Sequence, residues 1–284
     1  MPKEILMDTK VTLTGHRGWR AKYPENTMLG FRKALEIDVD AIEMDAHMTK
    51  DYQIVVCHDA DLARTTDTKG KIFNMTLEEV RKADAGIKFG EEFKGEKVPT
   101  FEEFAELMAT RPDVKLLLEL KDYPEELGDF AYASAEATLS ICKKYGIFGK
   151  DRLTVITFSA GICAWLRTRY TKEDFSIHGF YPKTCMRGWE KDDPYKYYDE
   201  VCLFNWGDKT PQGFPIDHGT PVADKARFTE FALMGIKPCV YYGMNTDENV
   251  YRQAFENGAI GFTCDHPDVC GEILDKLGAR KLKK

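Results

Sequence analysis

Residues 115–121 read Lys-Leu-Leu-Leu-Glu-Leu-Lys, an apolar run that contains one carboxylate, Glu119, and ends at Lys121. A run of this kind is typical of a parallel strand that is buried on both faces. A carboxylate on such a strand needs a cation or another partner, because an unpaired buried charge is strongly unfavourable. The segment therefore predicts a parallel sheet with a functional site, and a structural ion pair between Glu119 and Lys121 is the alternative.

Similar short apolar runs recur along the 284 residues, with amphipathic segments between most of them. The other runs are Val11–Thr14, Ala41–Ala46, Ile54–Cys57, Leu153–Thr157, Phe175–Phe180, Val201–Phe204, Pro238–Tyr242 and Ile260–Cys264. Alternating strands and helices imply parallel strands, and this many runs predict a closed (β/α)₈ TIM barrel in the α/β class, as a single domain over residues 1–284. An open doubly wound sheet is the alternative, but its G-x-G-x-x-G signature is absent after the first run.

Residues 59–99 interrupt this alternation. They are rich in Gly, Lys and Asp and hold one short helical segment near Thr76–Ala83. We predict a small insertion after the second strand that lies over one end of the barrel. In later irregular stretches, four aromatic residues are candidates for an apolar ledge beside a leaving group, with packing under a loop as the alternative. They are Trp189, Phe204, Trp206 and Phe214.

The overall charge limits the partners that we expect. A formal net charge of -7 argues against nonspecific binding to nucleic acid or to an anionic membrane. The first ten residues contain no apolar signal-peptide segment, and no apolar run approaches the ~20 residues of a membrane helix. Eight cysteines without a C-x-x-C pair indicate reduced thiols. We therefore expect a cytoplasmic protein without a stable membrane anchor, and the sequence does not indicate its oligomeric state.

Polar residues gather where the early strands end. Three acidic residues, Glu43, Asp45 and Glu119, lie on two of these strands. Alternate residues of a strand share a face, and the carboxyl ends of barrel strands meet at one mouth. We therefore expect an oxygen cage for one divalent cation, Mg²⁺ or Ca²⁺. For Glu43 and Asp45 alone, a solvated strand face is the alternative.

Basic residues and imidazoles occupy neighbouring positions. His16 and His58 each follow an apolar run directly, and a pair of histidines suits the transfer of protons to and from a phosphodiester. Arg17 and Lys121 are candidates for binding phosphate oxygens. The alternatives are loop or packing histidines and salt bridges to the nearby carboxylates. His47 continues the alternation of Glu43 and Asp45, so we expect a neighbour of the site rather than a catalyst.

These stretches resemble the glycerophosphodiester phosphodiesterases. The motifs that carry the resemblance are Gly15-His16-Arg17-Gly18, Pro24-Glu25-Asn26-Thr27, Glu43-Met44-Asp45, Thr49-Lys50-Asp51, His58-Asp59, Leu62, Arg64-Thr65-Thr66, Asp84-Ala85-Gly86, Val98-Pro99-Thr100-Phe101-Glu102-Glu103, Leu118-Glu119-Leu120-Lys121, Asn245 and Asp265-His266-Pro267. They are dense over residues 14–122 and sparse afterwards. A dozen matches in order are far more specific than any one of them.

The resemblance implies a barrel with a small insertion after the second strand and a divalent cation held by Glu43, Asp45 and Glu119. It implies His16 and His58 as the acid–base pair, with Arg17 and Lys121 near the phosphate. The family cleaves a small-molecule glycerophosphodiester to sn-glycerol 3-phosphate and an alcohol.

Two positions depart from the family's pattern. Family members often carry a Trp where this chain reads Tyr241-Tyr242-Gly243-Met244-Asn245, so we predict that Tyr242 forms the aromatic wall beside the glycerol, with a missing wall as the alternative. Tyr52 stands where the family commonly has Gly. Both departures concern substrate preference rather than the class of reaction.

Three other functions remain open at this point. A phospholipase D-like or lysophospholipid phosphodiesterase would use the same histidines and cation. A glycosidase would pair Glu43 or Asp45 with Glu119, but it leaves both histidines and Arg17 without a role. A binding module without turnover would keep the same pocket.

Overall fold

The computed structural model describes residues 10–203, 208–209, 215–216 and 224–280. In this part of the chain, nine strands are hydrogen-bonded in the order β1-β11-β10-β7-β6-β5-β4-β2-β3, and β1 also pairs with β2. The pairing of β1 with β2 closes the sheet. In this sheet β3 is the strand that runs antiparallel to its neighbour. The other eight strands are parallel and form a closed barrel, which confirms the predicted TIM barrel.

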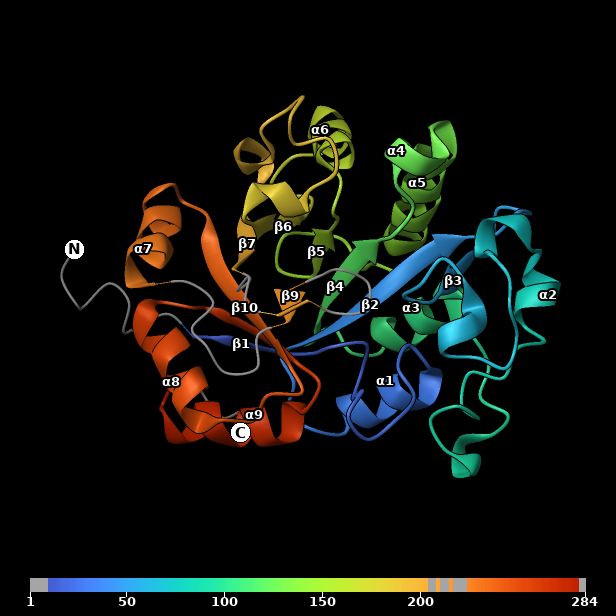
Figure 1. The fold of residues 1–284 in the computed structure, drawn as a ribbon, viewed down its shortest axis with the longest axis horizontal. Coiled ribbons are helices and arrows are strands. Elements are labelled where there is room, and N and C mark those ends of the chain that lie inside the picture. Colours follow the sequence, from blue (N-terminus) through green and yellow to red (C-terminus); the bar gives the residue numbers. More distant parts are fainter. Residues whose placement is uncertain (1–9, 204–207, 210–214, 217–223, 281–284) are drawn as a thin grey trace.

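The helices surround the strands (Figure 1). The barrel strands are β1 (Thr12–Gly15), β2 (Ala41–Met48), β4 (Lys115–Leu120), β5 (Leu153–Ile156), β6 (Ser176–Tyr181), β7 (Glu200–Leu203), β10 (Lys237–Gly243) and β11 (Gly261–Cys264). The helices are α1 (Met28–Leu35), α2 (Leu77–Val80), α3 (Phe101–Ala109), α4 (Pro124–Leu127), α5 (Asp129–Lys144), α6 (Ala160–Arg169), α7 (Lys225–Leu233), α8 (Glu248–Asn257) and α9 (Pro267–Lys276). The short strands β8 (Asp208–Lys209) and β9 (Pro215–Ile216) pair only with each other.

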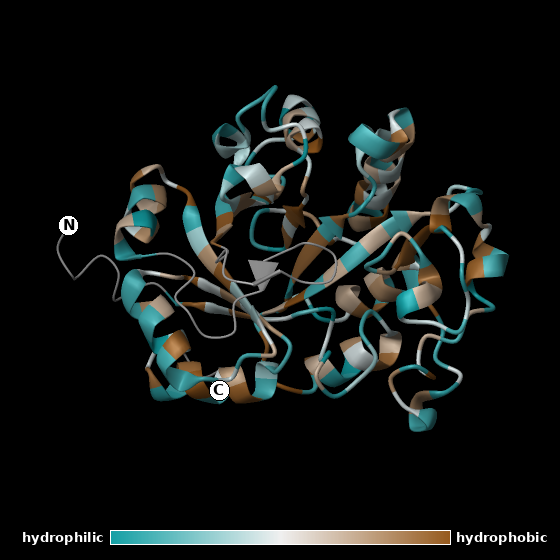
Figure 2. Cartoon of the chain, in the orientation of Figure 1, coloured by the Kyte–Doolittle hydropathy of each residue, from teal (hydrophilic) through white to brown (hydrophobic). Residues whose placement is uncertain are grey.

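The main core lies between the strands and the surrounding helices. Thr100 caps the start of helix α3, and its side chain forms a reciprocal capping box with Glu103. Its buried face includes Phe104, whose ring lies 4.5 Å from the ring of Phe31 on α1. In Figure 2 the strands β4 and β5 carry hydrophobic stretches, whereas α4 is largely hydrophilic.

No helix in the described ranges is both long and apolar enough to cross a membrane.

Strand β3 (Ile54–Val56) corrects one expectation from the sequence. The run 54–57 was predicted as one of the parallel strands, but β3 is antiparallel to β2 and pairs Val56 with Ala46. The chain turns at Tyr52, whose φ of 62° explains why glycine is favourable at this position. Because β3 returns toward the barrel, the Cys57 N–H donates to the Asp45 carbonyl at 3.1 Å, and His58 follows directly at the barrel mouth.

Residues 57–100 form a lobe beside β3 (Figure 1). The lobe has a separate small core that includes Leu62, Ile72 and Val80. Of the predicted aromatic ledge, Trp189 packs against the main core. Phe204, Trp206 and Phe214 lie outside the described residues.

Gly179 on β6 offers a test of the packing. A Cβ at this position would lie 1.8 Å from the ring of Tyr198, which is 2% exposed. Gly179→Ala must therefore displace this ring, and we expect it to lower the free energy of unfolding by about 3 kcal/mol. A Cβ at Gly161 on α6 meets nothing closer than 3.4 Å, so Gly161→Ala is a control that we expect to be neutral or slightly stabilising. Urea unfolding of the two variants tests this, and equal midpoints would contradict it.

Candidate functional site

Three carboxylates meet at the mouth of the barrel. Asp45 on β2 pairs directly with Glu119 on β4, and Glu43 lies two residues before Asp45 on the same face. One carboxylate oxygen of each residue lies within 4.8 Å of the other two. All three side chains are buried, with exposed fractions of 3% for Glu43, 0% for Asp45 and 7% for Glu119. The structure therefore brings the predicted ligands together, and their role as ligands stays a prediction.

Two basic side chains contact this cluster. Lys121 Nζ donates to Glu119 Oε1 at 2.6 Å and lies 3.2 Å from Asp45 Oδ1. The Arg17 backbone N–H donates to Glu43 Oε2 at 2.9 Å, and Arg17 Nε lies 3.4 Å from Asp45 Oδ2. Three carboxylates thus face two cationic side chains, and Arg17 is shared with Glu25. When all five groups are ionised, the cluster keeps an excess of negative charge.

The loop after β1 constrains the backbone at Arg17. Arg17 has a left-handed φ of 53°, which is unusual for a residue other than glycine. A Cβ on Gly15 would lie 2.8 Å from the Gly18 carbonyl oxygen, so the turn closes only with glycine there. Asn26, also at a left-handed φ of 54°, donates through its side-chain amide to Asp45 Oδ2 at 2.8 Å. Such strained positions often occur at functional sites.

The protonation of the carboxylates follows from their surroundings. Burial, and then the neighbouring charge of Asp45, raises the pKa of Glu43 well above its usual value. Burial also raises the pKa of Glu119. For Asp45 burial acts in the same direction, but Lys121, His58 and Arg17 hold its pKa well below the usual value. The surroundings therefore favour the protonated form of Glu43 and the ionised form of Asp45.

A divalent cation would fit this donor set. Asp45 Oδ1 is buried and has no hydrogen-bond partner among the described residues, although Lys121 Nζ lies close to it. A buried acceptor of this kind is rare unless a ligand or ion completes it. The three residues offer only oxygen atoms, which Mg²⁺ and Ca²⁺ prefer.

Each of the two predicted histidines is paired with an aspartate. His16 Nδ1 is 2.6 Å from Asp265 Oδ1, and His16 Nε2 is 3.9 Å from Glu43 Oε2. Burial and then the charge of Arg17 lower the pKa of His16 to about 4, although Asp265 acts in the opposite direction. His16 is therefore a neutral imidazole near pH 7, with Nε2 directed toward the carboxylates.

His58 has an arrangement of the same kind. Its Nδ1 lies 2.6 Å from Asp59 Oδ1, and Asp59 in turn accepts a hydrogen bond from Arg64 at 2.5 Å. Burial, followed by the positive charges of Lys121 and Arg17, lowers the pKa of His58 to about 3. Asp59 thus orients one imidazole as Asp265 orients the other. The candidate neighbour His47 instead pairs with Asp122 at 2.7 Å.

Sequence reasoning gave no role to several residues that complete the site. Asp265 follows β11 directly, as His16 follows β1, and the pairing of Gly15 with Cys264 makes them neighbours. Their shared position after a strand was a signal that could have identified Asp265. Glu25 accepts hydrogen bonds from three arginines, and Asn26 contacts Asp45. No spacing in the sequence predicts these last two contacts.

The prediction for Tyr242 requires a correction. Tyr242 is 4% exposed and its ring packs 5.2 Å from Tyr251 on α8, on the helix side of the barrel. The ring of Tyr241 instead lies 4.6 Å from the ring of His16. The register between β10 and β11 shifts between Tyr241 and Gly243, which the sequence does not reveal. Tyr241 therefore lies beside His16, and Tyr123 is a second aromatic residue at the site, because its hydroxyl donates to Glu119 Oε1 at 3.4 Å.

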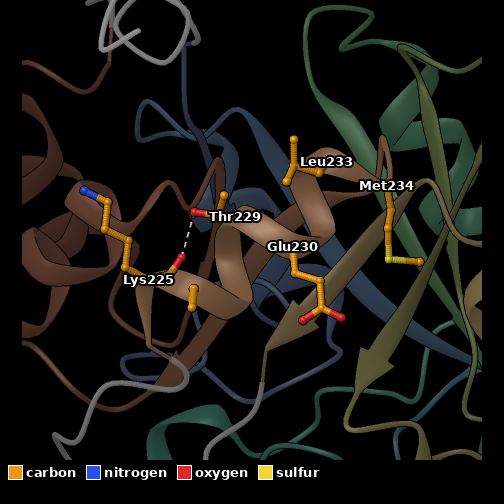
Figure 3. Close-up of a pocket in the computed structure, with 6 residues that line it drawn as sticks. Lys225, Thr229, Glu230, Leu233 and Met234 are labelled. Carbon is orange, nitrogen blue, oxygen red and sulfur yellow. Dashed lines mark hydrogen bonds between the residues drawn. The ribbon is translucent and has the colours of Figure 1, made fainter. Parts of the chain in front are cut away.

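A hollow beside α7 contains none of the predicted residues (Figure 3). Its lining residues are Lys225, Ala226, Thr229, Glu230, Leu233 and Met234. With a single carboxylate and no histidine, it offers no comparable chemistry.

Fold and geometry together define a TIM-barrel protein with an acidic cluster, two oriented imidazoles and two basic side chains at the carboxyl ends of its strands. Residues 16–269 match the model of the glycerophosphoryl diester phosphodiesterase family. The chain belongs to this family.

Individual relatives agree with this result. The chain is 45% identical over 151 residues to a glycerophosphodiester phosphodiesterase of Caldanaerobacter subterraneus subsp. tengcongensis. This match covers 53% of this chain and 59% of the relative, so it spans less than two thirds of the relative's length. It is 26% identical to a lysophospholipase D of Rattus norvegicus, over 93% of this chain and 86% of the relative. Its fold is similar to that of a phosphodiesterase of Oleispira antarctica solved in complex with the product sn-glycerol-3-phosphate, with a TM-score of 0.73, 21% identity and coverage of 94% and 97% of the two chains.

The charge imbalance predicts an unusual response to mutation. In the presence of a chelator, we expect Glu43→Gln to raise the free energy of unfolding by on the order of 1 kcal/mol. The change replaces a carboxyl whose charged form is disfavoured by burial and by Asp45 with a neutral amide, whose oxygen can still accept from the Arg17 N–H. Urea unfolding in EDTA measures the difference.

Glu25→Gln is the matched control. Burial acts to raise the pKa of Glu25, but Arg17 and Arg64 hold it well below the usual value, so we expect this variant to be less stable. Equal destabilisation by the two substitutions would contradict the account of the charges.

Proposed function

We propose that this chain hydrolyses glycerophosphodiesters to sn-glycerol 3-phosphate and an alcohol, with one Mg²⁺ or Ca²⁺ held by Glu43, Asp45 and Glu119. The observation that carries the proposal is the meeting of these three buried carboxylates beside two oriented imidazoles, in a chain that belongs to the family. The name of the bacterial relative and the product held by the Oleispira protein support the choice of substrate.

The basic side chains would bind the phosphate. Arg17 and Lys121 lie against the carboxylates, where their charges and the bound cation would together attract an otherwise repelled phosphodiester. When bound, the cation supplies Lewis-acid stabilisation of charge on the phosphate oxygens. Lys121 has a raised pKa, because Glu119 and Asp45 outweigh the lowering by burial, so it stays protonated. Tyr241, beside His16, is placed to flank the glycerol in the role first assigned to Tyr242.

The two histidines would move the protons. If Nδ1–H of each donates to its aspartate, Nε2 is left to accept a proton, and the aspartate stabilises the imidazolium that forms. One histidine takes a proton from the attacking hydroxyl or water, whose oxygen bonds to phosphorus. The other histidine has already taken a proton from solvent at Nε2, and it gives this proton to the alcohol oxygen as the bond from phosphorus to that oxygen breaks. When the attacking group is the glycerol hydroxyl, water then opens the cyclic phosphate by the reverse proton transfers. His16 is the base in one assignment and His58 in the other.

We further propose that residues 1–284 form one phosphodiesterase domain with an insertion at about 59–99. It would act in the cytoplasm on a small-molecule substrate.

Removal of the metal is the first test. We expect turnover of glycerophosphocholine, -ethanolamine, -inositol and -glycerol to fall to background in EDTA, because Arg17 and Lys121 offset the three carboxylates only in part and the remaining negative charge would repel the phosphate. Excess Mg²⁺, Ca²⁺ or Mn²⁺ should restore it. Release of sn-glycerol 3-phosphate is the measurement, and full activity in EDTA would refute a metal-dependent reaction.

Replacement of the histidines tests the proton transfers. His16→Asn and His58→Asn should each lower kcat by about 10²- to 10⁴-fold, because each removes one proton-transfer group. His266→Asn, at the start of α9 and outside the pair, is the control that we expect to retain activity. Near-wild-type turnover in either of the first two variants would remove that histidine from the acid–base pair.

A lysophospholipid phosphodiesterase is the second candidate function. The observation in its favour is the match over 93% of the chain to a protein named lysophospholipase D. Assays with glycerophosphocholine and lysophosphatidylcholine separate the two functions. A higher kcat/KM for the lysolipid would favour the second.

A further inference from the structure

A second group of potential metal ligands lies at the opposite end of the barrel. His178 on β6, Glu200 on β7 and Cys239 on β10 belong to three consecutive strands of the sheet. Glu200 is the first residue of its strand, whereas the carboxylate cluster lies at the carboxyl ends. One ligand atom of each side chain lies within 4.8 Å of the other two. The three side chains are 5%, 8% and 7% exposed, respectively.

The spacing suits a tetrahedral ion. His178 Nδ1 and Glu200 Oε2 are 3.4 Å apart. Two ligand atoms at ~2.0–2.1 Å from a tetrahedral Zn²⁺ are about 3.3 Å from each other. Glu200 Oε1 is already engaged by Lys115 at 3.2 Å and by Thr154 at 3.5 Å. The carboxylate is therefore oriented from one side, with Oε2 facing the imidazole.

The third ligand occupies a space that a glycine leaves open. A Cβ on Gly261 of β11 would lie 2.7 Å from Cys239 Sγ, so any other residue there would press on the sulfur. Lys115 forms an ion pair with Glu200 and balances part of the negative charge of its carboxylate. This ion pair alone is the alternative to a metal site. A thiol, an imidazole and one carboxylate oxygen on three adjacent strands nevertheless form a mixed donor set that differs from the oxygen cluster at the mouth.

We propose that His178, Glu200 and Cys239 bind one Zn²⁺ at the amino-terminal end of the barrel. Sulfur and nitrogen ligands select Zn²⁺ over Mg²⁺ and Ca²⁺, which take oxygen ligands. The metal–sulfur bond forms as the thiol of Cys239 gives one proton to solvent. Water supplies the fourth ligand. The ion links β6, β7 and β10 at the end of the barrel away from the carboxylate cluster.

Cobalt substitution tests this site separately from the mouth. The full chain is freed of metal with a chelator, exchanged into buffer and titrated with Co²⁺. We expect a near-ultraviolet sulfur-to-cobalt charge-transfer band that saturates at one equivalent and is bleached by Zn²⁺. The carboxylate cluster has no sulfur and cannot produce this band, so the result does not depend on the phosphodiesterase activity.

Variants identify the ligands. Cys239→Ser should abolish the band, and His178→Gln should weaken Co²⁺ binding by more than the ~10- to 100-fold that outer-shell replacements cost. Cys142→Ser, a buried thiol on α5, should leave the band unchanged. Circular dichroism verifies the fold of each variant, and His178→Gln serves if Cys239→Ser does not fold. No band in the wild-type protein, or an unchanged band in folded Cys239→Ser, would overturn the proposal.

Discussion

The charge balance at the barrel mouth is the constraint on which the rest of the site depends. Glu43, Asp45 and Glu119 are buried within reach of one cation, and Arg17 and Lys121 offset their charges in part. Like charges that are buried together are unfavourable. The carboxylates nevertheless lie together because β2 and β4 are neighbours in the barrel and pair in a fixed register. Three buried carboxylates lower the stability of the fold when no cation is bound. Such an arrangement is expected at a site where a bound cation supplies the balancing positive charge.

The surrounding loops hold the imidazoles against this cluster through a connected set of ion pairs. Glu25 accepts from Arg17 and from Arg64, and Arg64 also bonds Asp59, which orients His58. The loop after β1 and the lobe after β3 are thereby joined through Glu25 and Arg64. The antiparallel course of β3 matters for the same reason, because it directs the chain back to Asp45 just before His58. The position of each histidine thus depends on groups from several segments of the chain.

Much of this architecture could be predicted from local patterns. Apolar runs with polar ends predicted the barrel, and their alternation placed Glu43 and Asp45 on one face. What the sequence did not reveal depends on contacts between distant segments. The direction of β3 is set by its pairing with β2, and Tyr241 rather than Tyr242 lies beside His16 because the ring of Tyr242 packs against Tyr251 on α8. Neither leaves a trace in the spacing of hydrophobic residues.

A crystal of the protein soaked in Mn²⁺ would test the central claim most directly, because anomalous scattering locates this ion without assumptions about activity. The account predicts a strong peak at the barrel mouth, with oxygen atoms of Glu43, Asp45 and Glu119 at roughly 2.0–2.6 Å, the range of divalent cations with oxygen ligands. Lys121 should then have moved away from Asp45. A map without a peak between these carboxylates, at a Mn²⁺ concentration that supports turnover, would contradict it.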